Sequence, residues 1–148
     1  MPKRDEVVAD MNKSLFGVVR IYDRFRTNFA REHQLTVSDL RALSRIVERR
    51  SMTPKQLATS LDLTTGAVTP LIDRMVDSGY VTRGPHPTDR RSLLLEPTAA
   101  GRAMMRELEA AFEDLLRTGI VELDDERLED FSELLRILVA KGRELNLA

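Results

Sequence analysis

The sequence predicts a mainly α-helical protein that carries one small β-hairpin. Apolar residues recur at intervals of three and four along most of the chain, which is the period of one face of an α-helix. Between residues 80 and 96 this period is lost, and two strand-like runs enclose a loop that contains Pro85 and Pro87. Before this hairpin, two short helical segments begin with polar capping residues.

The composition is that of one globular domain spanning residues 1–148. Apolar residues make up 42% of the chain, charged residues 32%, and there is no cysteine. The lack of cysteine excludes disulfides, thiolate zinc sites and thiol-based redox sensing. No apolar run approaches the ~20 residues of a membrane span, and the N-terminus lacks the apolar core of a signal peptide. We therefore expect a soluble cytoplasmic protein with no membrane partner.

The charge is unevenly distributed along the chain. The net charge is −1, but residues 1–35 and 36–98 each carry +2, whereas residues 99–148 carry −5. The near-neutral total argues weakly against nucleic-acid binding. A basic face within the first two segments is nevertheless compatible with it, because the position of the charge counts more than its sum.

The first helix is expected from about residue 5 to residue 32. Seven apolar residues in this segment alternate spacings of three and four, which is a coiled-coil seam sustained over three heptads. They are Val8, Met11, Leu15, Val18, Tyr22, Phe25 and Phe29. Either this helix packs in the core of a monomer or it also packs on a second subunit, and the pattern favours neither.

Two shorter helices have recognisable starts. Thr36 and Asp39 have the spacing of a capping box, in which two side chains bond the free backbone N–H groups of the first turn. Thr53, Pro54 and Gln56 make a stronger signal, because the threonine caps, the proline suits the first helical position and the glutamine closes the box. This second helix is expected at 54–61.

The next helix is expected at 65–78, and Gly79 suits the position just after its end. Its apolar residues form one face, and they are Val68, Leu71, Ile72, Met75 and Val76. After the hairpin, Pro97 and Thr98 begin another helix, which Gly119 interrupts. Asp124 or Asp125 caps the last helix.

Two short helices followed by a hairpin are the order of a winged helix-turn-helix. Residues 52–101 resemble the DNA-binding core of the MarR family of transcriptional regulators. The resemblance rests on the capped short helix, the segment Gly66-Ala67-Val68-Thr69, the pairs Asp73-Arg74 and Gly79-Tyr80, and Asp89-Arg90-Arg91 in the wing.

This resemblance implies a homodimer that regulates transcription, with a winged helix-turn-helix at 36–98 and dimerisation helices at 1–35 and 99–148. It implies binding to double-stranded DNA, as a repressor on a pseudo-palindromic operator. In this family, small aromatic or phenolic ligands bind between the dimerisation and DNA-binding parts. Phe29 and His33 are our candidates for such a ligand site.

The helix at 65–78 presents the candidate DNA contacts on the face opposite its apolar stripe. Its N-terminal end is expected in the major groove, where threonine hydroxyls reach phosphates or base edges and a proline offers apolar surface to a thymine methyl. The candidates are Thr64, Thr65, Gly66, Thr69, Pro70 and Arg74, with Lys55 from the preceding helix.

Three of these residues also have an explanation without DNA. Pro70 is alternatively a tolerated kink, since a proline inside a helix loses one hydrogen bond. Arg74 is alternatively paired within its own helix, with Asp73 or Asp77. Lys55 is alternatively a solvated surface lysine.

The wing supplies the second expected contact. Arg91 stands in a proline-stiffened loop, from which an arginine can enter a narrow minor groove. Carried over from the family, Asp89 anchors Arg91 by a charge-assisted bond, and Arg90 contacts the DNA backbone.

Other classes of function find less support in the sequence. There is no recognisable nucleophile–base pair, phosphate loop or carboxylate pair, so we expect neither an enzyme nor a bound cofactor. Two histidines far apart make a poor metal site, and we expect no metal. The alternative function is a winged-helix module that binds protein without specific DNA binding, which only the near-neutral charge favours.

Overall fold

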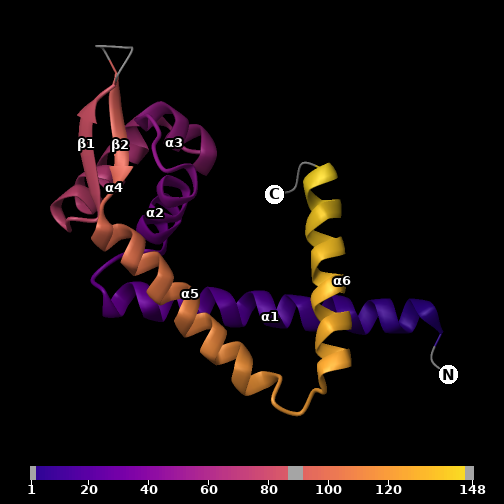
Figure 1. Cartoon of the computed structure of the whole chain (residues 1–148). Helices are drawn as coiled ribbons and strands as arrows, with labels where there is room; N and C mark the ends of the chain where they lie inside the picture. Colours follow the sequence, from indigo (N-terminus) through magenta and orange to yellow (C-terminus); the bar gives the residue numbers. More distant parts are fainter. Residues whose placement is uncertain (1–2, 87–91, 146–148) are drawn as a thin grey trace. The chain divides into compact units, whose positions relative to one another are not determined.

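The structure, a computed structural model, describes residues 3–86 and 92–145. The chain divides into two compact units, Met1–Ala110 and Ala111–Ala148. The elements in chain order are α1 (Arg4–Glu32), α2 (Val37–Arg49), α3 (Pro54–Leu61), α4 (Thr65–Asp77), β1 (Val81–Pro85), β2 (Leu93–Pro97), α5 (Ala99–Gly119) and α6 (Asp125–Glu144) (Figure 1). The predicted fold class, mainly α with one β-hairpin, is confirmed.

Both predicted capping boxes are present. The Thr36 backbone N–H donates to Asp39 at 2.9 Å, and the Asp39 N–H donates to the Thr36 hydroxyl at 3.1 Å. At the start of α3, the Thr53 N–H donates to Gln56 at 2.8 Å, and the Gln56 N–H donates to the Thr53 hydroxyl at 3.2 Å. These bonds satisfy backbone donors that have no partner within the helix.

The helix-turn-helix consists of α3 and α4, joined by a tight turn. Asp62 ends α3 in the left-handed conformation, with φ 55°, which aspartate tolerates better than most residues. At the other end of α4, Gly79 has φ 73°. The Tyr80 N–H donates to Met75 and the Gly79 N–H to Val76, both at 2.9 Å, which is the Schellman pattern that closes a helix.

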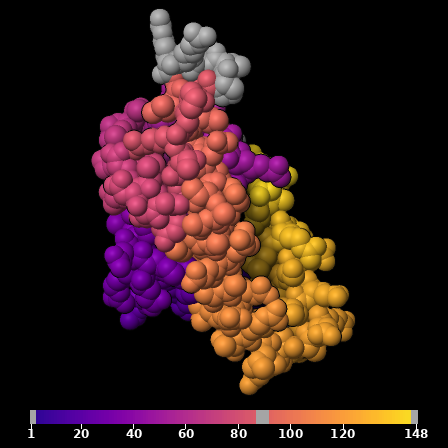
Figure 2. Space-filling view, turned by 60° about the vertical axis from the view of Figure 1, so that its left-hand side comes forward, coloured from indigo at the N-terminus to yellow at the C-terminus, as the bar shows by residue number. Residues whose placement is uncertain are grey.

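The wing is an antiparallel hairpin in which Val81 pairs with Pro97 and Pro85 with Leu93. A third backbone segment joins it: Met52, in the connection between α2 and α3, exchanges two backbone hydrogen bonds with Leu95 at 2.8 and 3.1 Å. This bridge fixes the start of α3 against the wing. Figure 2 shows α4 and the hairpin, in pink and salmon, packed against each other.

The core of the first unit lies between α2, the helix-turn-helix and the hairpin. Each of these elements contributes apolar side chains that are almost fully inaccessible to water, namely Leu40, Leu43, Ile46, Leu57, Val68, Met75, Val81 and Leu95. Burial of such side chains contributes about 1.5–3 kcal/mol each before the entropy cost of folding is subtracted.

The second unit has little core of its own. Asp124 accepts a hydrogen bond from the Arg127 N–H at 2.9 Å and so caps α6, as one of the two expected residues. No residue described in α6 is buried. Its apolar residues include several that are exposed, among them Phe131, Leu135 and Leu138.

Candidate nucleic-acid interface

The two faces of α4 are separated as the sequence predicted. Val68, Leu71, Ile72 and Met75 are buried against the rest of the first unit. The opposite face is exposed and carries Gly66, Thr69, Pro70, Asp73, Arg74 and Asp77. One face of α4 is therefore packed in the core, and the opposite face is accessible to a partner molecule.

The exposed start of α4 is rich in hydroxyl groups. The Thr64 hydroxyl accepts a hydrogen bond from the Ala67 N–H at 3.2 Å, so Thr64 is the N-cap. The Thr69 hydroxyl donates to the carbonyl oxygen of Thr65 at 3.1 Å. Three hydroxyls here are exposed and can donate to acceptors on a partner, those of Thr64, Thr65 and Thr69.

Pro70 lies inside α4 without ending it. The helix continues to Asp77, although a proline has no N–H to donate to the carbonyl of Gly66. Its ring is exposed on the same face as Thr69. The arrangement leaves an apolar surface beside the hydroxyl groups.

Arg74 is paired with a residue that sequence reasoning missed. Its Nε and Nη2 donate to the carboxylate of Asp39, on α2, with the shortest distance 2.8 Å. The expected alternative, an ion pair with Asp73 or Asp77 in the same helix, is wrong because the carboxylate of Asp39 reaches the guanidinium from a neighbouring helix. Asp73 instead pairs with Arg83 of β1. Consecutive residues of α4 are thus tied to α2 and to the base of the wing.

Asp39 is charged although it is buried. Burial by itself raises the pKa of a carboxyl group, but the hydrogen bonds from Arg74 and Thr36 outweigh it and hold the pKa of Asp39 below its ordinary value. The carboxylate in turn raises the pKa of Arg74. Both groups therefore keep their charges at neutral pH.

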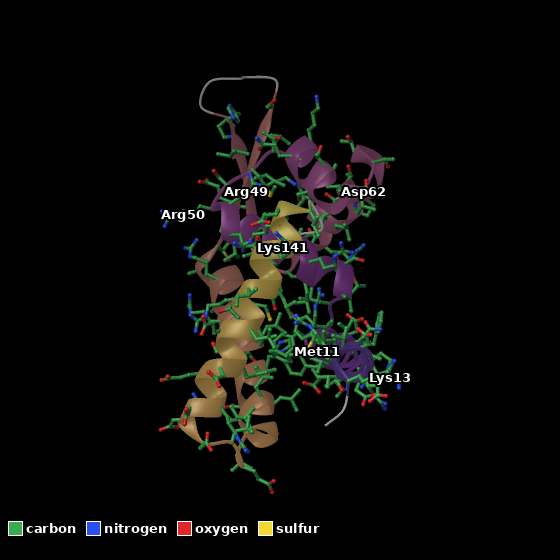
Figure 3. The ribbon with its side chains drawn as sticks, turned by 90° about the vertical axis from the view of Figure 1, so that its right-hand side faces the viewer. Met11, Lys13, Arg49, Arg50, Asp62 and Lys141 are labelled. Atoms are coloured by element: carbon green, nitrogen blue, oxygen red, sulfur yellow. The ribbon has the colours of Figure 1, made fainter. Side chains whose placement is uncertain are left out.

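Lys55 lies in the first turn of α3 and is exposed. Together with Arg49, Ser51, Gln56 and neighbouring residues it lines a hollow of about 350 Å³. In Figure 3, Arg49 and Arg50 are labelled on the left, and Asp62, at the turn into α4, is labelled on the right.

The wing candidates Asp89, Arg90 and Arg91 lie outside the described residues.

The proposed ligand residues are in contact with each other near the end of α1. The rings of Phe29 and His33 have centroids 4.3 Å apart, and His33 Nε2 lies 3.5 Å from Glu107 of α5. Phe29 is buried, whereas His33 is half-buried.

A hollow of about 220 Å³, not predicted from the sequence, lies beside the turns of α1 that precede Phe29. It is lined by residues of α1, α2 and α5, including Tyr22, Arg26, Arg41 and Arg45. The Arg26 guanidinium lies 5.5 Å from the centre of the Tyr22 ring. The spacing of four between Tyr22 and Arg26 was the only sequence signal for this arrangement.

Comparison with known proteins decides the family. The model of the MarR family matches residues 35–93. The HTH-type transcriptional regulator YcgE of Bacillus subtilis, itself uncharacterised, is 31% identical over 108 residues, covering 73% of this chain and 68% of that protein. The chain belongs to the MarR family of transcriptional regulators.

Solved structures of the MarR family share the fold. A MarR family protein from Bacillus stearothermophilus aligns with TM-score 0.81 and 20% identity, covering 96% of this chain and 99% of that one. A mutant MarR from E. coli, complexed with operator DNA, aligns with TM-score 0.60 and 23% identity, covering 93% and 99%. These likenesses are evidence for the winged-helix fold.

Two features are absent from the described residues of this MarR-family chain, 3–86 and 92–145. Within them, no three histidine, aspartate or glutamate side chains are grouped so as to hold a metal ion. Within the same residues, no helix is both long enough and apolar enough to cross a membrane.

Proposed function

We propose that this MarR-family regulator is a homodimeric repressor that binds a pseudo-palindromic operator in double-stranded DNA and acts without catalysis. The observation that carries the proposal is α4, which is buried along one side and exposes hydroxyl groups, an apolar ring and an arginine on the other. The N-terminal turns of α4 enter the major groove, where Thr64, Thr65, Gly66, Thr69 and Pro70 face the bases and phosphates.

Backbone contacts come from Arg74 and Lys55 and from the wing. Arg91 enters the minor groove, Asp89 holds it in position, and Arg90 contacts a phosphate. The ion pair between Asp73 and Arg83 supports this arrangement, because it joins α4 to the strand that leads into the wing.

The exposed apolar surface supports the homodimer. Val8, Val18 and Val19 of α1 are exposed, as are Phe131 and Ile137 of α6. A monomer seldom leaves so many large apolar side chains in water. The helices at 1–35 and 99–148 therefore pack against their copies in a second chain, which places two winged helices on two half-sites.

A small aromatic or phenolic ligand releases the repressor from DNA. The contact between Phe29 and His33 supports a site near the end of α1, and the neighbouring hollow with Tyr22 and Arg26 suits an aromatic anion. Release requires that the ligand bind the DNA-free state more tightly. Titration of the protein–DNA complex with 4-hydroxybenzoate tests this, and an Arg26→Ala variant is expected to lose the response.

The experiment for DNA binding begins with selection of duplexes from a randomised library by the wild-type protein. Fluorescence anisotropy across a salt series then compares wild type with Arg91→Ala, and with Arg127→Ala of α6 as the matched control. We expect Arg91→Ala to weaken binding by about 1–3 kcal/mol and Arg127→Ala to bind as wild type. If no sequence is enriched, the protein-interaction module becomes the preferred function.

A further inference from the structure

Asp39 carries a buried charge that the proposed DNA contacts do not explain. It is the one charged side chain among the buried residues that the structure describes. The carboxylate accepts hydrogen bonds from the Thr36 N–H at 2.9 Å, from the Thr36 hydroxyl at 2.8 Å, and from Arg74. A buried ion pair is weak evidence for stability alone, because desolvation offsets most of its attraction. The ion pair therefore has room for a second role beside its part in the fold.

The geometry of the pair leaves part of Arg74 available. A guanidinium is planar and has five N–H donors in a fixed arrangement. Asp39 binds the edge formed by Nε and Nη2, and this fixes the plane in which Nη1 lies. The side chain of Asp39 is 1% exposed but that of Arg74 is 46% exposed, so the pair has a buried half and a half that faces solvent.

We propose that Asp39 is a positioning residue for operator binding, which holds the Arg74 guanidinium so that Nη1 donates to a DNA phosphate. This inference rests on the proposed function and adds a residue to it. Arg74 cannot readily leave Asp39, because departure would strand a buried carboxylate without its cation. The arginine is therefore ordered before DNA arrives, and binding loses less side-chain entropy than it would with a free arginine.

The capping role of Asp39 can be separated from this positioning role. Asp39 takes part in the capping box of α2 through Thr36, and it holds Arg74 through its carboxylate oxygens. Thr36→Val removes the hydroxyl of the box and leaves the contact with Arg74. It is the matched control, since it weakens α2 without releasing the guanidinium.

The test measures binding to a duplex selected from a randomised library by the wild-type protein, at several salt concentrations. We expect Asp39→Asn to weaken binding about tenfold and to reduce the salt dependence by about one phosphate contact per subunit. Arg74→Gln is expected to do the same, and the double variant should bind no more weakly than Arg74→Gln alone. Thr36→Val should keep the wild-type salt dependence.

Three results overturn the inference. The first is that Asp39→Asn binds the duplex as tightly as wild type. The second is that the losses of binding free energy in the two single variants add up in the double variant. The third is that Thr36→Val loses as much salt dependence as Asp39→Asn. If Asp39→Asn does not fold, Arg74→Lys replaces it, because a lysine keeps the charge but cannot make the two-point contact. Arg74→Lys is then expected to bind about tenfold more weakly, and wild-type binding by it overturns the inference.

The proposed function fails in a different way. If the wild-type protein enriches no sequence from the library, both the proposed function and this inference are wrong. If the wild type enriches a sequence and binds it, but the Asp39 and Arg74 variants bind it equally well, operator binding stands, and the inference is wrong together with the backbone contact proposed for Arg74.

Discussion

Gly101 lies against the backbone of Tyr80 with no room for a side chain. A Cβ atom at position 101 would be 2.2 Å from the Tyr80 carbonyl oxygen and 3.2 Å from Leu43 Cδ1. The same carbonyl accepts a hydrogen bond from the Thr98 N–H at 3.0 Å, and the Thr98 hydroxyl donates to Gly79 at 2.7 Å. The first turn of α5 is thus packed directly against the residues that end α4.

Gly101→Ala is expected to destabilise the protein by about 2–3 kcal/mol, because the methyl group must displace backbone rather than a flexible side chain. Urea denaturation measures the change. The control is Gly119→Ala, where an added Cβ would meet nothing within 4 Å. A Gly101→Ala variant as stable as Gly119→Ala would contradict the close approach.

Asp39 is expected to give the protein a specific sensitivity to acid. Its pKa is lowered in the folded state, so its stabilising contribution is complete above the unfolded pKa of about 3.9 and is lost as the pH falls through the folded value. Asp39→Asn should be less stable than wild type at pH 7, by about 2–3 kcal/mol given the partial exposure of Arg74.

As the pH falls from about 4 through the lowered folded pKa of Asp39, the stabilities of Asp39→Asn and wild type should converge, because the wild-type carboxyl group then becomes protonated in the folded state too. Free energies of unfolding measured between pH 2 and pH 7 test this expectation. A constant difference across that range would show that Asp39 keeps its charge throughout, or that the amide costs stability for another reason.

Thr64 offers a way to separate helix capping from DNA binding. Aspartate and asparagine are both good N-cap residues, so Thr64→Asp and Thr64→Asn should each keep the stability of α4 within about 0.5 kcal/mol. If the start of α4 faces DNA, the added carboxylate repels the phosphates, and Thr64→Asp should bind at least about tenfold more weakly than Thr64→Asn. Equal binding by the two variants would place Thr64 away from the DNA.

The proposed homodimer predicts that substitutions on the two sides of α1 affect dimerisation differently. Met11 belongs to the apolar seam, whereas Lys13 pairs with Asp10 on the polar side, and Figure 3 shows the two on opposite sides of the helix. Met11→Glu should shift the protein toward monomer in analytical ultracentrifugation, because burying an unpaired carboxylate in the interface is costly. Lys13→Glu should stay dimeric, and equal dissociation of both variants would contradict the seam.

Features that depend on neighbouring residues could be predicted from the sequence. The Thr36–Asp39 and Thr53–Gln56 boxes and the glycine at the end of α4 each involve residues within one or two turns. The buried stripe of α4 follows from helical period alone. Such features need only local chain geometry, which the sequence determines directly.

Contacts between elements were decided by the tertiary structure. The sequence placed Arg74 on the exposed face of α4 but suggested partners in its own helix, whereas Asp39 lies 35 positions earlier. Nothing local distinguishes Gly101 from other helical glycines, and only its approach to Tyr80 forbids a side chain.

The sequence by itself therefore determined the order of elements, their caps and the face that α4 exposes. The tertiary structure alone decided which residues hold that face in place: Asp39 behind Arg74, Arg83 beside Asp73, and Gly101 against Tyr80. The physical reason is the separation along the sequence of the residues that interact. Caps and helical faces follow from bonds between residues three or four apart, whereas these contacts form only when packing of the core brings separate elements together.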